Sequence, residues 1–240
     1  MERLGRFVER RVVVKALERA CVEVSPEIVR RTILFVDYLK KVNETVNLTA
    51  ITDDETIGTR HLQDSWMLHP YIPERSTMID VGSGAGFPGL ALKIIRPDLD
   101  VTLLDSVRKK TDFLESAIAL LDLRHARAIH GRAEELGRDY SYRDHFDIAV
   151  ARAVTALPTL LELALPLVKP GGLLIAMKGR DDETPESVRA LEQLKGRLEE
   201  VVSYELPDTD HARSFVIVRK LLPTPSRYPR RMAAIKKNPL

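Results

Sequence analysis

Apolar residues in the first third of the chain recur at the three-to-four-residue spacing of amphipathic helices. The clearest run follows Ser25-Pro26, a serine in a capping position and a proline suited to the first helical turn, and continues through Phe35 and Leu39. This pattern predicts a helix over residues 26–42. Weaker patterns predict helices at about 4–20 and 55–67. We therefore expect residues 1–70 to form a helical extension.

From residue 76 onward, short apolar runs alternate with helical patterns. Strand-like runs cover 77–80, 101–105, 126–130, 146–151, 173–177 and 213–220, and helical patterns cover 89–95, 108–121, 157–168 and 186–198. This alternation predicts parallel strands with right-handed crossovers and helices on both faces. We expect a doubly wound α/β domain over 71–222, with its ligand beyond the carboxyl ends of the strands.

Composition narrows the class of protein. The chain has 240 residues, of which 44% are hydrophobic, and its 37 Lys and Arg nearly balance 35 Asp and Glu, so net charge does not indicate a nucleic-acid partner. The single cysteine, Cys21, excludes an internal disulfide and a cysteine zinc site and fits a reducing compartment. The six histidines show no close pairing typical of metal ligands. We predict no metal.

The amino-terminal segment helps to predict the cellular location of the protein. It reads MERLGRFVERR, which is charged where a signal peptide needs an apolar run. No stretch of the chain reaches the roughly 20 apolar residues of a membrane span. We therefore predict a cytoplasmic protein with no membrane partner.

The loop after the first predicted strand is the most informative segment, reading Asp80-Val81-Gly82-Ser83-Gly84-Ala85-Gly86-Phe87-Pro88-Gly89. Its glycines permit positive φ and close approach of the backbone to a ligand. Dinucleotide folds need G-x-G-x-x-G, whereas this G-x-G-x-G after an acidic residue is similar to the first motif of class I methyltransferases. A merely tight turn is the alternative. The predicted cofactor-binding residues here are Gly82, Ser83, Gly84, Gly86 and Phe87.

Polar residues also follow the next three strands. Asp105, before Ser106, can accept hydrogen bonds from both ribose hydroxyls of an adenosine cofactor, although either residue would equally cap the next helix. Ala133 and Glu134 follow the third strand, where class I methyltransferases usually contact adenine. Arg152 closes the fourth strand and can hold a phosphate or carboxylate through two hydrogen bonds.

Taken together, these motifs closely resemble the RsmG (GidB) family. The resemblance covers about residues 43–220 and rests on Asn47-Leu48-Thr49, Arg60-His61 with Asp64-Ser65, the 80–89 loop, Leu104-Asp105-Ser106, Ala151-Arg152-Ala153 and Lys178-Gly179. It implies a seven-stranded methyltransferase sheet and methylation of a guanine at N7 in small-subunit (16S) ribosomal RNA by S-adenosyl-L-methionine. It also implies cofactor contacts from Gly82, Phe87, Ala133, Glu134 and Arg152, with Asp105 and Ser106 nearby.

Guanine N7 already carries a lone pair, so this reaction needs no general base, and positioning should dominate catalysis. Our substrate-side candidates are Arg152, Lys178 and Asn47. We expect Arg152→Ala to abolish turnover and leave the fold intact. His61 and Asp64 share a helical face, where they either bond each other and hold the extension to the sheet or contact substrate.

Residues 223–240 are basic and contain no acidic side chain. Four prolines disfavour regular structure, so we predict a flexible arm that neutralises RNA phosphates. Its basic residues are Arg227, Arg230, Arg231, Lys236 and Lys237. Near the other end, Arg3, Arg6, Arg10, Arg11, Lys15 and Arg19 are additional candidates. The expected partner of the protein, a monomer, is small-subunit ribosomal RNA or the subunit itself.

Other classes stay open at this point. A nicotinamide-dependent oxidoreductase would share Asp105 but not the glycine spacing. A non-catalytic RNA-binding module could keep the fold. A methyltransferase acting on a small molecule or a protein would keep the fold and the cofactor.

Overall fold

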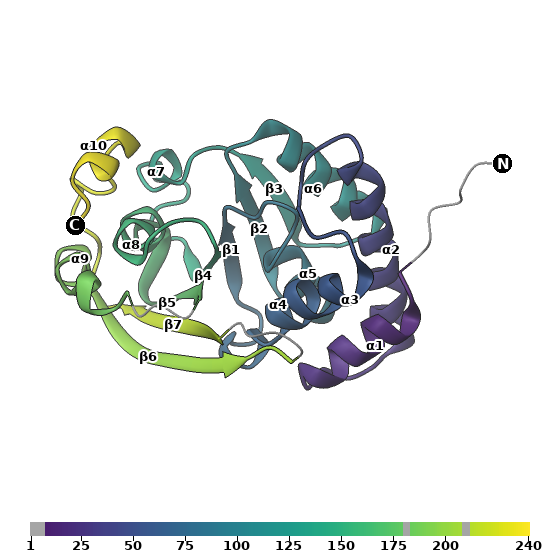
Figure 1. Cartoon of the computed structure of the whole chain (residues 1–240). Coiled ribbons are helices and arrows are strands. Elements are labelled where there is room, and N and C mark those ends of the chain that lie inside the picture. Colours follow the sequence, from purple (N-terminus) through teal and green to yellow (C-terminus); the bar gives the residue numbers. More distant parts are fainter. Residues whose placement is uncertain (1–7, 180–182, 208–211) are drawn as a thin grey trace.

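The computed structural model describes residues 8–179, 183–207 and 212–240 and is built on a seven-stranded sheet (Figure 1). The strand order is β3-β2-β1-β4-β5-β7-β6. β7 runs antiparallel to both of its neighbours, β5 and β6, and the other neighbouring strands pair in parallel. The strands are β1 (Thr77–Val81), β2 (Asp100–Asp105), β3 (Ala126–His130), β4 (Phe146–Arg152), β5 (Val168–Lys178), β6 (Gly196–Glu205) and β7 (Ala212–Lys220). The predicted doubly wound, mostly parallel sheet is confirmed.

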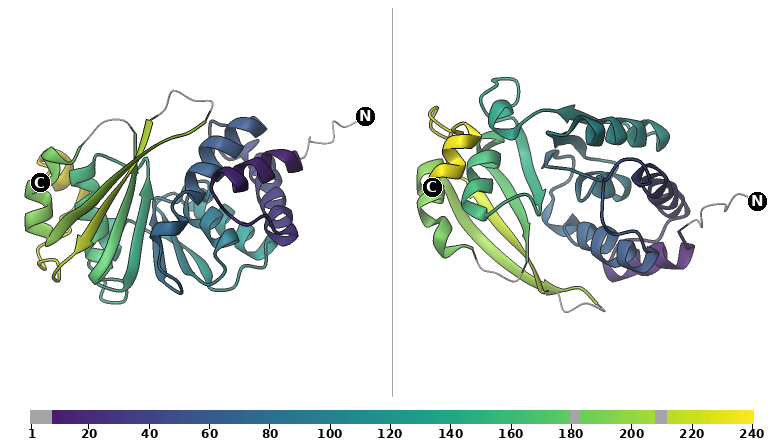
Figure 2. Two further views of the ribbon diagram at one scale, coloured as in Figure 1. Left: turned by 90° about the horizontal axis from the view of Figure 1, so that it is seen from below. Right: turned by 45° about the horizontal axis from the view of Figure 1, so that its top comes forward.

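Helices cover both faces of the sheet (Figures 1 and 2). On one face lie α5 (Gly89–Ile95) and α6 (Arg108–Leu120), which share a hydrophobic core with the amino-terminal helices. The other face carries α7 (Ala133–Leu136), α8 (Leu157–Ala164), α9 (Val188–Leu194) and α10 (Met232–Lys237) around a second core. Because β1, β2, β3 and β4 run parallel, their carboxyl ends meet at one edge of the sheet.

The amino-terminal extension packs on α5 and α6. α1 (Arg10–Arg19) is shorter than predicted, and Arg3 and Arg6 lie outside the described residues. α2 (Pro26–Asn43) begins as predicted, since Ser25 Oγ accepts the N–H of Ile28 at 3.2 Å. Tyr38 of α2 stacks on Phe113 of α6 with 5.4 Å between ring centroids. The extension and the sheet therefore share one core.

The helix predicted over 55–67 is divided into three parts. They are α3 (Asp54–Thr56), a seven-residue π-helix, η1 (Ile57–Gln63), and α4 (Asp64–Trp66), followed by a 3₁₀ turn, η2 (His69–Tyr71). A π-helix widens the turn and rotates the side chains that follow it. His61 lies within this π-helix, and Asp64 follows it directly.

Two predictions near the antiparallel edge need correction. The helical pattern over 186–198 contains a 3₁₀ turn, η4 (Pro185–Ser187), and α9, but it ends at Leu194, and β6 begins at Gly196. Leu198 continues the helical spacing of Leu191 and Leu194, and a bulge between Leu198 and Glu200 interrupts the alternation of the strand. Similarly, α8 ends at Ala164 before a 3₁₀ turn, η3 (Leu165–Leu167), and β5 starts earlier than predicted.

The basic segment after β7 is not a flexible arm. Tyr228 is 4% exposed, and residues 232–237 form α10, whose Ile235 is fully buried. Arg143 Nη1 donates to the carbonyl of Tyr228 at 2.9 Å, and Arg138 Nε donates to that of Pro229 at 2.7 Å. The prolines exclude regular structure only up to residue 229. Arginines elsewhere in the chain supply the hydrogen bonds that dock the segment.

Candidate active site

The glycine loop between β1 and α5 is held by two carboxylates. Asp105 Oδ2 accepts the N–H of Gly84, and Asp80 Oδ2 accepts the N–H of Gly89, both at 2.9 Å. Gly82 has φ +77°, and a Cβ there would lie 2.8 Å from Cγ2 of Val154. Only glycine therefore fits where the loop passes the end of β4.

Asp105 makes hydrogen bonds within the protein that do not depend on a ligand. Its Oδ1 accepts the N–H of Val107, the residue before α6, at 2.9 Å, but α6 has no side-chain cap hydrogen bond, so Asp105 orders the turn into the helix and does not cap it. Each carboxylate oxygen has a second lone pair. The side chain can therefore still accept ribose hydroxyls while it holds the loop and the start of α6.

A pocket of about 300 Å³ opens at the carboxyl ends of β1, β2, β3 and β4. Six of the predicted cofactor-binding residues line it, namely Gly82, Asp105, Ser106, Ala133, Glu134 and Arg152. The glycine that lets the backbone approach, the carboxylate at the end of β2 and the small Ala133 fit S-adenosylmethionine. That each of the six contacts the cofactor remains a prediction.

Four other predicted cofactor residues lie behind this lining. Ser83 Oγ donates to the carbonyl of Asp80 at 2.9 Å, and Gly84 and Gly86 shape the loop with positive φ. Phe87 is buried, and its ring stacks on His61 with 4.5 Å between centroids. Lys110, Arg132 and Met232 also line the pocket, and none of them was among the predicted site residues.

Complete burial of Asp80 raises the pKa of its carboxyl to about 7, although the N–H of Gly89 opposes the rise. Asp80 does not line the pocket, and its observed contacts hold the loop. We therefore assign it a structural role.

Arg152, at the end of β4, binds the amino-terminal extension. Its Nη1 donates to the carbonyl of Arg60 at 2.8 Å and to Asp64 Oδ2 at 3.2 Å, and its Nη2 donates to His61 Nδ1 at 3.2 Å. The guanidinium also lies 5.4 Å from the centroid of Phe87. His61 and Asp64 thus meet through Arg152, not through a bond to each other. Arg152 has a structural role in addition to the predicted functional one.

His61 is held in one neutral form. A guanidinium only donates, so Nδ1 of His61 must accept from Arg152, and Nε2–H donates to Thr49 Oγ1 at 2.9 Å. Burial, and secondarily the charge of Arg152, lowers the pKa of His61 to about 3. The ring therefore stays uncharged at neutral pH.

This buried histidine predicts an acid-sensitive stability. Below about pH 6.5 the unfolded chain protonates His61 and the folded chain does not, so the free energy of unfolding should fall by up to about 1.4 kcal/mol per pH unit toward pH 3. Urea unfolding at pH 4.5, 5.5 and 7.5 should show a shallower decline for His61→Gln than for wild type. The exposed His145→Gln is the matched control. Parallel declines for wild type and His61→Gln would contradict the assignment.

A second pocket, of about 410 Å³, adjoins the first and shares Arg152, Ala153 and Val154 with it. Lys178 lines it, donating to the carbonyl of Thr155 at 2.7 Å and to Glu183 at 3.1 Å. Its further charged residues are Asp64, Glu183 and Arg213. The predicted substrate residues Arg152 and Lys178 therefore meet in one pocket.

Asn47 is not brought to this site. It lies exposed in the loop after α2 and lines neither pocket. The loop is held by Asn43 instead, whose Oδ1 accepts the N–H of Leu48 at 2.8 Å. The structure gives no support for Asn47 as a substrate ligand.

Asp64 has a second partner that the sequence did not indicate. Its Oδ1 accepts the hydroxyl of Tyr204, on β6, at 2.7 Å. Asp64 is 2% exposed, so its charge is compensated inside the protein by Arg152 and Tyr204. The extension, β4 and β6 therefore meet at this carboxylate.

In the described ranges, no group of three or more His, Cys, Asp or Glu residues is arranged to hold a metal ion. No helix in these ranges has both the length and the apolar character needed to cross a membrane.

Solved methyltransferases share this fold. A SAM-dependent methyltransferase from Aquifex aeolicus matches 78% of this chain and 98% of its own, with a TM-score of 0.54 and 18% identity. TYW2 from M. jannaschii, solved in complex with AdoMet, matches 67% of this chain and 76% of its own, with a TM-score of 0.53 and 13% identity. The fold, the glycine loop and the pocket together define a class I S-adenosylmethionine-dependent methyltransferase.

Sequence relatives narrow the class further. The model of the GidB family, described as rRNA small subunit methyltransferase G, matches residues 29–212. Proteins named Ribosomal RNA small subunit methyltransferase G are 44% identical in Acetivibrio thermocellus (96% of both chains) and 46% identical in Thermoanaerobacter sp. strain X514 (82% of this chain, 84% of the relative). The chain belongs to the RsmG (GidB) family.

Proposed function

We propose that this enzyme transfers the methyl group of S-adenosylmethionine to N7 of a guanine in small-subunit ribosomal RNA. The observation that carries the proposal is the second pocket, which adjoins the predicted cofactor pocket and shares the end of β4 with it. Membership of the family supports the choice of RNA. We include in the proposal a monomeric enzyme acting in the cytoplasm, where its single cysteine fits a reducing compartment.

The cofactor supplies an electrophilic methyl group, and guanine N7 supplies a lone pair, so no residue has to remove a proton first. The work of the chain is to orient the acceptor. Arg152, Lys178 and Arg213 give the second pocket cations suited to the phosphates that flank a base. Asp64 and Glu183 also line this pocket, each paired with one of its cations, Asp64 with Arg152 and Glu183 with Lys178.

The test is transfer of radiolabelled methyl from S-adenosylmethionine to small ribosomal subunits from a strain that lacks this gene. We expect label in one N7-methylguanosine on nucleoside analysis. Label at another atom would overturn the N7 assignment. No label, with cofactor binding intact, would overturn the RNA assignment and favour a small-molecule or protein acceptor, or a non-catalytic RNA-binding module.

The exposed cations of α10 should contribute to RNA affinity. Lys236 and Lys237 are exposed, whereas Arg230, also predicted to bind RNA, is paired with buried Glu162. Each lost phosphate contact lowers the slope of log affinity against log salt by about 0.7 to 0.9, so Lys236→Ala/Lys237→Ala should flatten it by about 1 to 2.

Filter binding of small-subunit RNA at several KCl concentrations measures this slope. Arg124→Ala is the matched control, because Arg124 is exposed just before β3, at the opposite edge of the sheet from the pockets. Equal slopes for wild type and the double lysine variant would remove α10 from the RNA interface. Arg227 and Arg231 are also exposed and remain candidates.

A further inference from the structure

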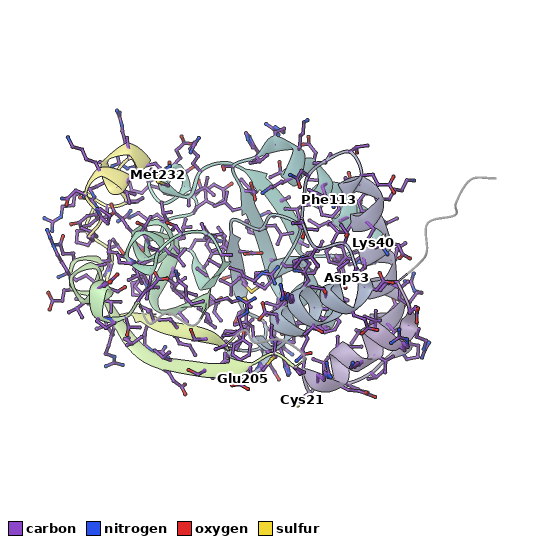
Figure 3. The ribbon with its side chains drawn as sticks, in the orientation of Figure 1. Cys21, Lys40, Asp53, Phe113, Glu205 and Met232 are labelled. Carbon is purple, nitrogen blue, oxygen red and sulfur yellow. The ribbon has the colours of Figure 1, made fainter. Side chains whose placement is uncertain are left out.

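One wall of the cofactor pocket comes from the segment after β7. Met232 lies at the start of α10 (Figure 3). It lines the pocket together with Ala133 and Leu163. The predicted cofactor residues come from the strand ends and loops of the sheet, whereas Met232 comes from a segment that the sequence analysis assigned only to RNA. These three side chains are apolar. This side of the pocket therefore suits the apolar part of a ligand.

The position of Met232 is fixed by an ion pair two residues earlier. Arg230 Nη2 donates to Glu162 Oε2 at 2.6 Å, and its backbone N and Nε both donate to Glu162 Oε1 at 2.8 Å. Glu162, on α8, is fully buried. A buried carboxylate with three charge-assisted or backbone bonds defines where the chain must pass. The segment is thus anchored immediately before it reaches the pocket.

The helix itself divides its side chains between two environments. Ile235, three residues after Met232, is fully buried in the core around α8, whereas Lys236 and Lys237 are exposed. Residues three apart share a helical face, so Met232 and Ile235 face the protein together. Burial of Ile235 keeps Met232 turned toward the pocket.

We propose that α10 is part of the cofactor-binding site and that Met232 packs against the adenine ring of S-adenosylmethionine. The ring is the flat apolar part of the cofactor, and a thioether makes favourable contacts with aromatic rings. Ala133 and Glu134, predicted on the adenine side from their place after the third strand, line the same pocket as Met232. The proposal depends on the cofactor and not on the identity of the RNA.

Isothermal titration with S-adenosylmethionine, without RNA, tests the contact. Met232→Ala should raise the Kd at least about tenfold, because even one missing methylene in an apolar pocket costs about that much, and Met232→Leu should retain most of the affinity. The affinity of Met232→Ala for adenosine alone should be lower than that of wild type by the same factor, because adenosine keeps the ring and lacks the methionine part. Asn238→Ala, exposed at the end of the same helix, should bind as wild type. An unchanged Kd for Met232→Ala would overturn the proposal.

A double-mutant cycle tests the anchor. Arg230→Ala should weaken cofactor binding because α10 leaves the pocket, and Met232→Ala added to it should then cost little more. Circular dichroism identifies any variant that fails to fold. If a variant fails to fold, hydrogen exchange of the wild-type protein still tests the proposal, because S-adenosylmethionine should slow exchange at residues 232–237. Additive effects in the cycle, or unchanged exchange there, would overturn the anchoring role. If RNA is not the substrate, these cofactor-binding results should be unchanged, and only methyl transfer to RNA should be absent.

Discussion

Replacing Arg152 with alanine should lower kcat by at least about a hundredfold, the cost of small misplacements at a reacting centre. It should also lower the free energy of unfolding by about 3 to 5 kcal/mol, because Asp64 would keep a buried charge without its cation. In a protein of this size that corresponds to a fall in Tm of roughly 10 °C. The expectation from sequence that the fold stays intact is therefore revised. Differential scanning calorimetry and single-turnover methyl transfer measure the two effects.

The two effects of this variant can be separated. Arg152→Lys keeps the charge but not the planar fork that reaches Asp64 and His61 together, so it should recover stability more than turnover. Arg219→Ala is the control, because Arg219 pairs with Glu199 at the surface, away from both pockets. Turnover should be compared well below the Tm of each variant. Wild-type turnover by Arg152→Ala under those conditions would remove Arg152 from the reaction.

Replacing Asp105 with alanine should raise the Kd for S-adenosylmethionine about a hundredfold. Hydrogen bonds to a charged group contribute about 1.5 to 3 kcal/mol each, and Asp105 is predicted to accept from the ribose. The variant also frees the N–H groups of Gly84 and Val107, which loosens the glycine loop and the start of α6. Isothermal titration measures the change directly.

A matched control exists on the same strand. Asp100, at the opposite end of β2, is paired only loosely with Arg127 at 3.8 Å, so Asp100→Ala should bind the cofactor as wild type. Asp105→Asn keeps an acceptor oxygen, so its Kd for the cofactor should lie between those of Asp100→Ala and Asp105→Ala. Binding by Asp105→Ala within about threefold of wild type would show that the carboxylate serves the loop alone.

The parallel half of the fold could be predicted because its signals are local. The end of each strand carries its own functional residue, and parallel pairing brings those ends to one edge, so Gly82, Asp105, Ala133 and Arg152 meet without any long-range information. β6 could not be predicted in the same way. Its bulge disturbs the alternation of apolar residues, and Leu198 extends the helical spacing of α9.

The contacts that sequence reasoning missed join distant parts of the chain. Tyr204 meets Asp64 across 140 positions, and Arg230 meets Glu162 across 68. A charged residue in a sequence carries no sign of which opposite charge it will find, so residues 223–240 suggested only affinity for phosphate. Their docking, and with it Met232 in the pocket, depends on arginines and a glutamate located in other elements.

The bond between Tyr204 and Asp64 also limits how this enzyme can be recombined. The amino-terminal helices supply Asp64, the parallel sheet supplies Arg152, and the antiparallel edge supplies Tyr204. A chimaera that joins these helices to the sheet of another methyltransferase would bury an unmatched carboxylate or leave an unmatched guanidinium, unless all three residues are transferred together. In protein engineering, these three regions therefore have to be transferred together.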